Sequence, residues 1–135
     1  MSDLMIVGGK LSRIEVERGT EKVKSINVRI GINDIQIKNQ NIGISYSYNV
    51  KYLDNAGEIK ITGILYAKEN KKLTNQIKKS WNKNKDDRKL PADYSAMLIN
   101  AINYTGMANG TVTAKLLDLP PPLVSPKVTL KPLQK

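Results

Sequence analysis

The side chains with the clearest chemical potential are basic, and they gather in one stretch of the chain. The sequence has 135 residues and a formal net charge of +10, from 22 Lys and Arg against 12 Asp and Glu. Residues 68–90 hold nine of those basic residues but only three acids, so they carry more than half of the excess charge. Concentrated positive charge suits contact with phosphates, where each lysine releases a counterion. The members are Lys68, Lys71, Lys72, Lys78, Lys79, Lys83, Lys85, Arg88 and Lys89.

Aromatic rings near these lysines complete a candidate RNA-binding surface. Trp81, Tyr66 and Tyr94 are available to stack on a base or to pack on a sugar. Arg29 and Lys51 are expected to point away from the buried face of a sheet, where they form a second basic surface. Two plainer interpretations stay open: the lysines of the connector form a solvated loop that keeps the protein soluble, and the lysines of the sheet deter edge-to-edge aggregation.

Few residues suit catalysis. The chain has no cysteine and no histidine, which excludes a thiolate nucleophile, an imidazole base and the usual zinc ligands. Glu15 and Glu17 share an exposed strand face and residues 86–87 are acids among lysines, so neither pair has the buried setting that paired catalytic carboxylates need. The run Gly8-Gly9-Lys10 lacks the pattern of a phosphate-binding loop, and we expect a turn there. We therefore expect no enzymatic activity, no metal and no cofactor.

The element that must position any site is a strand at residues 42–52. Apolar and tyrosine side chains occupy every second position, which is the period of a strand with one buried face. Tyr46, Tyr48 and Tyr52 resemble a stacking platform, but at strand spacing beside isoleucines they are expected in the core. Residues 54–57 suit a tight turn and residues 58–68 resume a β pattern, so the two runs predict an antiparallel hairpin.

Two more strands precede this hairpin. Ile14 and Val16 alternate with charged residues within residues 10–18, and alternation returns in residues 25–32. A one-residue phase slip at Asn33 and Asp34 predicts a bulge or a bend. No connection before residue 69 is long enough for a helical crossover, so we expect four antiparallel strands in a meander or a Greek key.

Helical patterns follow the sheet. Three apolar residues at four-residue spacing predict a marginal helix inside the basic connector. Pro91 suits the first position of a long helix of about 26 residues, which we expect to be weakened or kinked near Gly106 and Gly110. The first stripe is Leu73, Ile77 and Trp81, and the second is Tyr94, Leu98, Ala101, Ile102, Thr105, Ala108, Val112 and Leu116. The prolines at 120–122 stop the long helix, and the remainder is expected to be extended.

A chain of this length is expected to form one domain. We predict an N-terminal extension (1–9), a single domain (10–128) and a basic C-terminal tail (129–135). Within the domain we place a sheet at 10–68, the basic connector at 69–90 and the long helix at 91–118. No run approaches the roughly 20 apolar residues of a membrane span, and the start lacks the basic region of a signal peptide. We expect a cytoplasmic protein with no membrane partner.

The order of these elements resembles the SecB-like export chaperones and their archaeal single-domain relatives. Leu90-Pro91 is similar to the aromatic or leucine followed by proline that introduces the long helix of that family. Residues 98–102 resemble its Leu-Ile core pattern, and residues 119–126 resemble its hydrophobic-Pro-Pro-Leu segment with a later proline. The resemblance implies an α+β fold, with four antiparallel strands and a long helix packed on one face. It also implies an oligomer that holds unfolded polypeptides in apolar grooves.

The charge of the chain departs from that family. The resemblance implies docking through acidic sheet residues and a zinc-binding tail rich in Cys and His, whereas this chain is basic and its tail has neither residue. We therefore predict a non-enzymatic SecB-like protein whose partner is ribosomal RNA on a ribosome, contacted by the connector and the tail. The alternative is a SecB-like molecular chaperone that binds unfolded polypeptides as a homo-oligomer.

Overall fold

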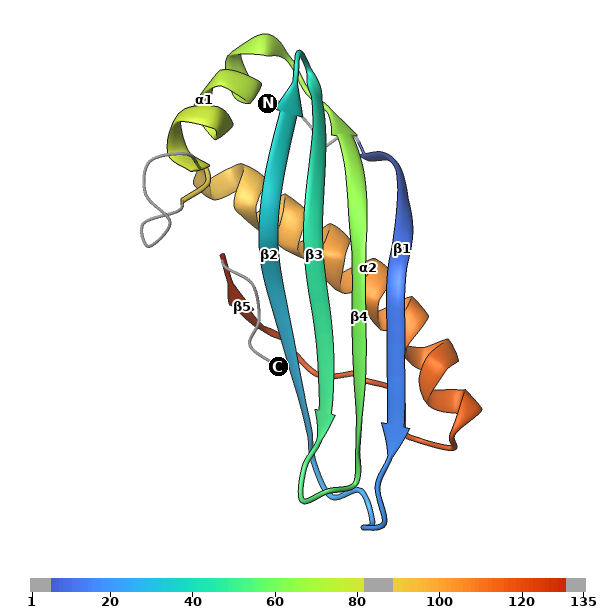
Figure 1. Cartoon of the computed structure of the whole chain (residues 1–135). Helices are drawn as coiled ribbons and strands as arrows, with labels where there is room; N and C mark the ends of the chain where they lie inside the picture. The colour runs from blue at the N-terminus through green and yellow to red at the C-terminus, as the bar shows by residue number, and fades with distance from the viewer. Residues whose placement is uncertain (1–5, 82–88, 131–135) are drawn as a thin grey trace.

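The protein is an open sheet with one long helix laid across a single face (Figure 1). The computed structural model describes residues 6–81 and 89–130. The elements are β1 (Ile6–Arg18), β2 (Ile26–Lys38), β3 (Asn41–Tyr52), β4 (Gly57–Lys68), α1 (Lys71–Trp81), α2 (Ala92–Leu116) and β5 (Lys127–Thr129). In Figure 1, α2 runs diagonally behind the strands and α1 lies beside the upper end of β2. The predicted α+β class, with a long helix on one face of an antiparallel sheet, is confirmed.

The strand order is β1-β4-β3-β2-β5. Strands β2, β3 and β4 form a meander, and the last of them, β4, lies beside β1. This arrangement of four strands is a Greek key. The sheet has five strands rather than the predicted four, because the chain after α2 comes back along β2. There Val128 pairs with Ile30 in a parallel register. This topology leaves β1 at one edge of the sheet.

Strand β1 begins at Ile6, four residues before its predicted start. The expected turn at Gly8 and Gly9 is wrong, because these glycines pair with Tyr66 and Leu65 of β4 and so continue the strand. The register shifts between Leu11 and Arg13, which leaves one extra residue in β1 and marks a bulge.

The centre of the sheet follows the predicted alternation. Tyr46, Tyr48 and Tyr52 of β3 are at most 2% exposed on the face that α2 covers, so their assignment to the core is confirmed. The predicted hairpin is also present, and its turn holds Asp54 and Asn55 at φ of 60° and 64°. The phase slip in β2 appears as a register shift between Ile32 and Asp34.

Helix α2 runs unbroken through both of its central glycines, but its buried stripe differs from the predicted one. The buried positions are Tyr94, Leu98, Ile102, Gly106, Gly110, Thr113 and Ala114. Val112 and Leu116, which were expected to face the sheet, are 65% and 74% exposed. The reason is that the Tyr48 ring fills the space beneath the helix, so only a residue without a side chain fits at Gly106.

The chain after α2 folds back on the sheet and fixes the helix end. Arg18 Nη1 donates to the carbonyl oxygens of Leu117 and Asp118 at 2.7 and 2.8 Å, and these groups would otherwise lack a partner at the helix terminus. Tyr52 Oη donates to the Pro120 carbonyl oxygen at 2.5 Å. These contacts tie β1, β3 and the tail into one unit.

Candidate functional site

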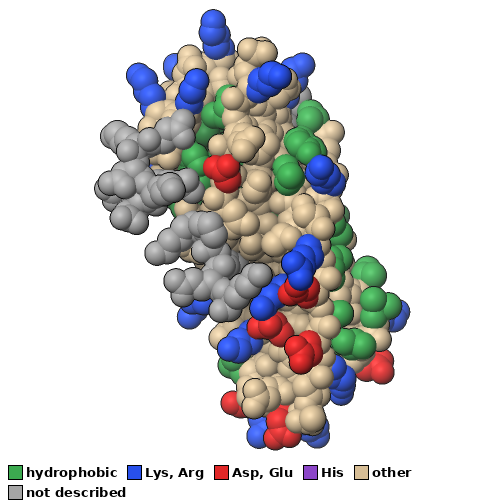
Figure 2. Space-filling model, in the orientation of Figure 1, with side chains coloured by type: hydrophobic (Ala, Val, Ile, Leu, Met, Phe, Trp, Pro, Cys, Tyr) green, Lys and Arg blue, Asp and Glu red, His purple; other side chains and the backbone are tan. Residues whose placement is uncertain are grey.

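The predicted basic connector forms a positively charged end of the molecule. Six of its lysines are exposed, and Figure 2 shows lysine and arginine side chains gathered around α1 at the upper end. Lys83, Lys85 and Arg88 lie outside the described residues. Within the described ranges, the ion pairs join Arg13 to Glu15 and Lys60 to Glu58, so none involves this group. The six lysines, called the basic end below, are Lys68, Lys71, Lys72, Lys78, Lys79 and Lys89.

The aromatic residues assigned to this surface are mostly not available to a nucleic acid. Trp81 is 2% exposed and Tyr94 is 3% exposed, so their predicted stacking role is wrong. Both rings belong to the same core cluster as Ile77 and Leu98, because α1 and the start of α2 bury one face each. That burial raises the pKa of Tyr94, with the nearby charge of Glu69 acting in the same direction. Tyr66 keeps 39% of its surface exposed.

Arg29 and Lys51 are exposed on the uncovered face of the sheet, as expected, but they lie far from the basic end. Arg29 is nine residues along β2 from Lys38, and Lys38 pairs with Asn41, which pairs in turn with Lys68. At about 3.3 Å per residue the separation is about 30 Å. The two predicted basic surfaces are therefore separate.

A second surface, which was not predicted from the sequence, is apolar and lies along β1 and α2. It consists of exposed hydrophobic side chains, and we call it the apolar edge. Figure 2 shows hydrophobic side chains along the right-hand side of the molecule, over the upper strand ends and over the protruding end of α2. The apolar edge comprises Ile6, Val7, Leu11 and Ile14 of β1, which are 38–59% exposed, and Tyr104, Val112 and Leu116 of α2, which are 65–79% exposed.

A groove of about 470 Å³ opens in this edge between the first half of β1 and the middle of α2. Ile6, Gly9 and Leu11 line it from the strand, and Ala101 and Tyr104 line it from the helix. The register places these β1 residues opposite Ala67, Leu65 and Gly63 of β4, so they belong to the helix-covered face of the sheet. At this groove, side chains on the helix-covered face of the sheet are therefore accessible to solvent.

The floor of the groove includes a tyrosine held between sheet and helix. Burial raises the pKa of Tyr46, and a hydrogen bond with Thr105 of α2 acts in the opposite direction. Gly63 lies directly beneath the Tyr46 ring, since a β-carbon there would be 2.7 Å from Tyr46 Oη. The absence of a side chain at Gly63 thus leaves room for the Tyr46 ring on the inner side of the groove.

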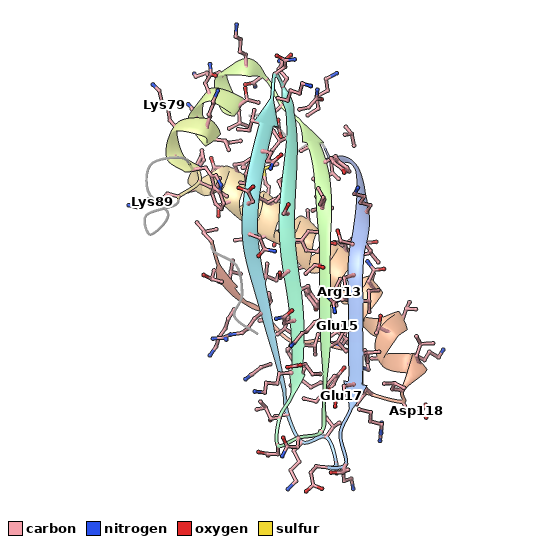
Figure 3. The ribbon with its side chains drawn as sticks, viewed as in Figure 1. Arg13, Glu15, Glu17, Lys79, Lys89 and Asp118 are labelled. Carbon is pink, nitrogen blue, oxygen red and sulfur yellow. The ribbon has the colours of Figure 1, made fainter. Side chains whose placement is uncertain are left out.

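Most of the charged residues of β1 lie in its second half. Figure 3 shows Arg13, Glu15 and Glu17 following one another along β1 from the middle of the molecule downward, while Lys79 and Lys89 lie higher and on the other side of the sheet's strands. Arg13 forms an ion pair with Glu15. Residues 6–11 contain one charged residue, Lys10, so the half of β1 that borders the groove is the less polar one.

The sequence carries a signal for this surface, but Ala108, Val112 and Leu116 were predicted to face the sheet. Tyr104, Ala108, Val112 and Leu116 recur every four residues, which forms a second row beside the buried stripe of α2. The edge position of β1 had no signal in local sequence, because it depends on which strand β1 pairs with.

Neither a metal site nor a membrane span is found in the described part of the chain. Among residues 6–81 and 89–130 there is no group of three or more acidic, histidine or cysteine residues that could hold a metal ion. No helix in those ranges is both long and apolar enough to cross a membrane.

Comparison with solved structures identifies the fold. The SecB-like chaperone Rv1957 of Mycobacterium tuberculosis, solved in complex with a ChAD peptide from the Rv1956 HigA1 antitoxin, superposes with a TM-score of 0.61. The match covers 91% of this chain and 86% of the mycobacterial chain, at 11% sequence identity. No protein-family model and no curated protein matches the sequence. The chain therefore has a SecB-like fold, as the resemblance implied.

Proposed function

We propose that this protein is a non-enzymatic, SecB-like molecular chaperone that binds unfolded polypeptide segments at the apolar edge. The observation that supports the proposal is the groove between β1 and α2, where core-facing positions of both elements are open to solvent. Exposed apolar surface next to a concave site is typical of protein-binding surfaces. The structurally similar mycobacterial chaperone was solved with a peptide bound, which supports a polypeptide as the partner.

This proposal reverses the order of the two interpretations drawn from the sequence. Ribosomal RNA as the partner now depends on the charge of the basic end and on the exposed ring of Tyr66, because Trp81 and Tyr94 are buried and Arg29 and Lys51 lie elsewhere. Lysines bind polyanions through phosphates, and phosphate contacts carry no sequence information by themselves. The homo-oligomer and the cytoplasmic location stay predictions from the sequence.

A client-aggregation assay with two matched variants tests the proposal. Leu11→Thr removes an apolar side chain that lines the groove and keeps a good strand former. Val128→Thr removes an apolar side chain of nearly equal exposure, 39% against 40%, from β5. We expect the wild-type protein and Val128→Thr to suppress light scattering by an unfolding client, and Leu11→Thr to suppress it several-fold less well.

The same proteins distinguish the RNA interpretation. Sedimentation with ribosomes and with free ribosomal RNA is measured across a salt series, since phosphate contacts lose affinity steeply as salt rises. If the protein ignores clients but pellets with ribosomes in a salt-dependent way, polypeptide binding at the apolar edge is refuted. Fluorescence of the single tryptophan, Trp81, which is buried, confirms that each variant is folded.

A further inference from the structure

Four lysines of the basic end lie on one exposed face of α1, and none of them forms an ion pair within the described part of the chain. The buried side chains of this helix are Thr74, Ile77 and Trp81. At 100° per residue the four lysines span about 120° of the remaining surface, and residues seven apart are separated by about 10 Å along the axis. These residues, called the lysine face below, are Lys71, Lys72, Lys78 and Lys79.

The position of this charge on the helix is locally unfavourable. Lys71 and Lys72 occupy the first turn, where the helix dipole is positive, and that turn has no acid. The acid next to the helix in the chain, Glu69, is 6% exposed, so its charge is not presented beside the lysines at the surface. An anionic partner would therefore relieve repulsion among the lysines in addition to making its own contacts.

A groove of about 750 Å³ opens beside the lysine face, between α1 and the first turns of α2, and we call it the α1–α2 groove. Figure 1 shows these two segments next to each other at the upper left of the molecule. The apolar lining includes Leu73 of α1 and Pro91, Ala96 and Met97 at the start of α2. A cavity of about 150 Å³ holds a benzene ring, so the groove has room for several apolar side chains.

The charges in the lining of this groove balance one another. It is lined by one lysine, Lys72, which also belongs to the lysine face, and by one acid, Asp93. The groove itself therefore favours an apolar occupant over an anion. Selection for negative charge comes from the neighbouring lysine face, and Lys72 connects the two surfaces.

An apolar groove beside a cationic surface narrows the class of partner. A nucleic acid would contact the lysines through its phosphates, but Tyr94, the ring in the lining, is 3% exposed and offers no surface for a base. A flat anionic membrane would contact the lysines and leave the groove empty. A polypeptide that carries both apolar and acidic side chains uses both surfaces at once.

We infer that the α1–α2 groove binds an apolar polypeptide segment and that the lysine face binds acidic residues flanking that segment. The inference rests on the proposed chaperone function, because it takes an unfolded polypeptide as the partner, and it adds selection by charge. Residues of an extended chain are about 3.3 Å apart, so four flanking residues cover the length of the lysine face. Apolar contacts supply affinity, and the opposite charges orient the segment.

Three fluorescently labelled peptides test the selection by charge. Each has four apolar residues followed by four glutamates, four serines or four lysines, and its affinity is measured by anisotropy. We expect the glutamate peptide to bind about tenfold more tightly than the serine peptide, and the lysine peptide to bind least. The difference should shrink between about 0.1 and 1 M salt, because the screening length falls from about 10 to about 3 Å.

Matched variants test the location. Lys72→Gln removes one charge and should weaken the glutamate peptide about threefold, with little effect on the serine peptide. Lys22→Gln makes the same change in the exposed segment between β1 and β2, at the other end of the sheet, and should have no effect. Met97→Gln makes the lining of the groove more polar and should weaken the glutamate and serine peptides alike. Leu11→Thr, at the apolar edge, should weaken neither.

Two results would overturn the inference and leave polypeptide binding intact. If the glutamate peptide binds no better than the lysine peptide, the selection by charge is wrong. If Leu11→Thr weakens the peptides and Met97→Gln does not, the peptides bind at the apolar edge and the α1–α2 groove is not their site.

Three other results would overturn it by assigning the surface differently. If a single-stranded oligonucleotide binds in a salt-dependent way and no peptide does, the lysine face serves a nucleic acid. If sedimentation velocity shows a dimer that Lys72→Gln dissociates, and no peptide binds, the groove belongs to a second copy of this chain. If no peptide binds and no client is protected from aggregation, the proposed function itself fails.

Discussion

Replacing Gly106 with alanine is expected to destabilise the protein, although alanine is the better helix former. A β-carbon at position 106 would lie 2.2 Å from Tyr48 Cδ2, 2.5 Å from Cγ and 2.6 Å from Cε2. Carbon atoms ordinarily approach one another to about 3.5 Å, so the helix or the ring would have to move by about 1 Å. Tyr48 is fully buried, so its ring has no free space to enter.

The magnitude follows from two opposing effects. Overpacking a well-packed core costs about 1–3 kcal/mol, and the upper end applies here because the clash is with a ring near its attachment point. Replacing glycine with alanine in a helix interior stabilises the helix by about 1 kcal/mol, which offsets part of this cost. We therefore expect the free energy of unfolding to fall by about 2 kcal/mol, which corresponds to a Tm lower by roughly 8 °C at about 4 °C per kcal/mol.

Gly110 provides the matched control on the same helix. A β-carbon there would lie 3.0 Å from Pro122 Cγ and 3.5 Å from Tyr48 Cε1, and a shift of a few tenths of an ångström relieves the tighter contact. Gly110→Ala should therefore stay within about 1 kcal/mol of the wild type, because its smaller clash is offset by helix propensity. Urea denaturation followed by Trp81 fluorescence measures both variants. If Gly106→Ala is as stable as the wild type, the close approach of α2 to Tyr48 is refuted.

Three further predictions concern the tyrosines and the end of α2. Tyr48 Oη is buried without a hydrogen-bond partner among the described residues, whereas Tyr52 Oη donates to the Pro120 carbonyl oxygen. Denaturation midpoints should therefore show Tyr48→Phe to be about 1 kcal/mol more stable than the wild type and Tyr52→Phe about 1 kcal/mol less stable. Burial, assisted by the nearby Tyr52, raises the pKa of Tyr48 from its ordinary value of 10.0 to about 12. The folded state then holds this proton more tightly than the unfolded state. The contribution of Tyr48 is therefore fully present below pH 10 and is lost between pH 10 and about 12, and the loss should shrink in Tyr48→Phe. Arg18→Gln removes the charged donor at the Leu117 carbonyl, so hydrogen exchange in the last turn of α2 should accelerate by about tenfold, while Arg18→Lys should keep part of the protection.

Local sequence determined β2, β3, β4, the second part of β1 and most of the helix positions, because hydrophobic period is a property of neighbouring residues. The alternation in residues 42–52 predicted β3 and the burial of its three tyrosines, and the phase slip at Asn33 and Asp34 predicted the bulge in β2. Pro91 located the start of α2 to within one residue. The order of these elements also carried the SecB-like resemblance, which the superposition supports at the level of the fold.

The surfaces of the molecule depended on tertiary structure. Trp81 and Tyr94 were predicted to face a nucleic acid because they lie among lysines, yet the packing of α1 and α2 on the sheet buries both rings. The stripe of α2 was predicted through Val112 and Leu116, because glycine carries no hydrophobic signal. The Tyr48 ring reverses that assignment by requiring glycine at position 106.

The apolar edge shows most clearly which features local sequence determines and which depend on tertiary structure. In the first part of the chain, the sequence predicted a strand only at residues 10–18 and placed Ile6 and Val7 in an N-terminal extension, whereas β1 begins at Ile6. The pairing of β1 with β4 and of β2 with β5 places β1 at one edge of the described sheet, beside Tyr104 of α2. Residues more than 90 positions apart in the chain form the groove, and no local pattern specifies a contact over that distance.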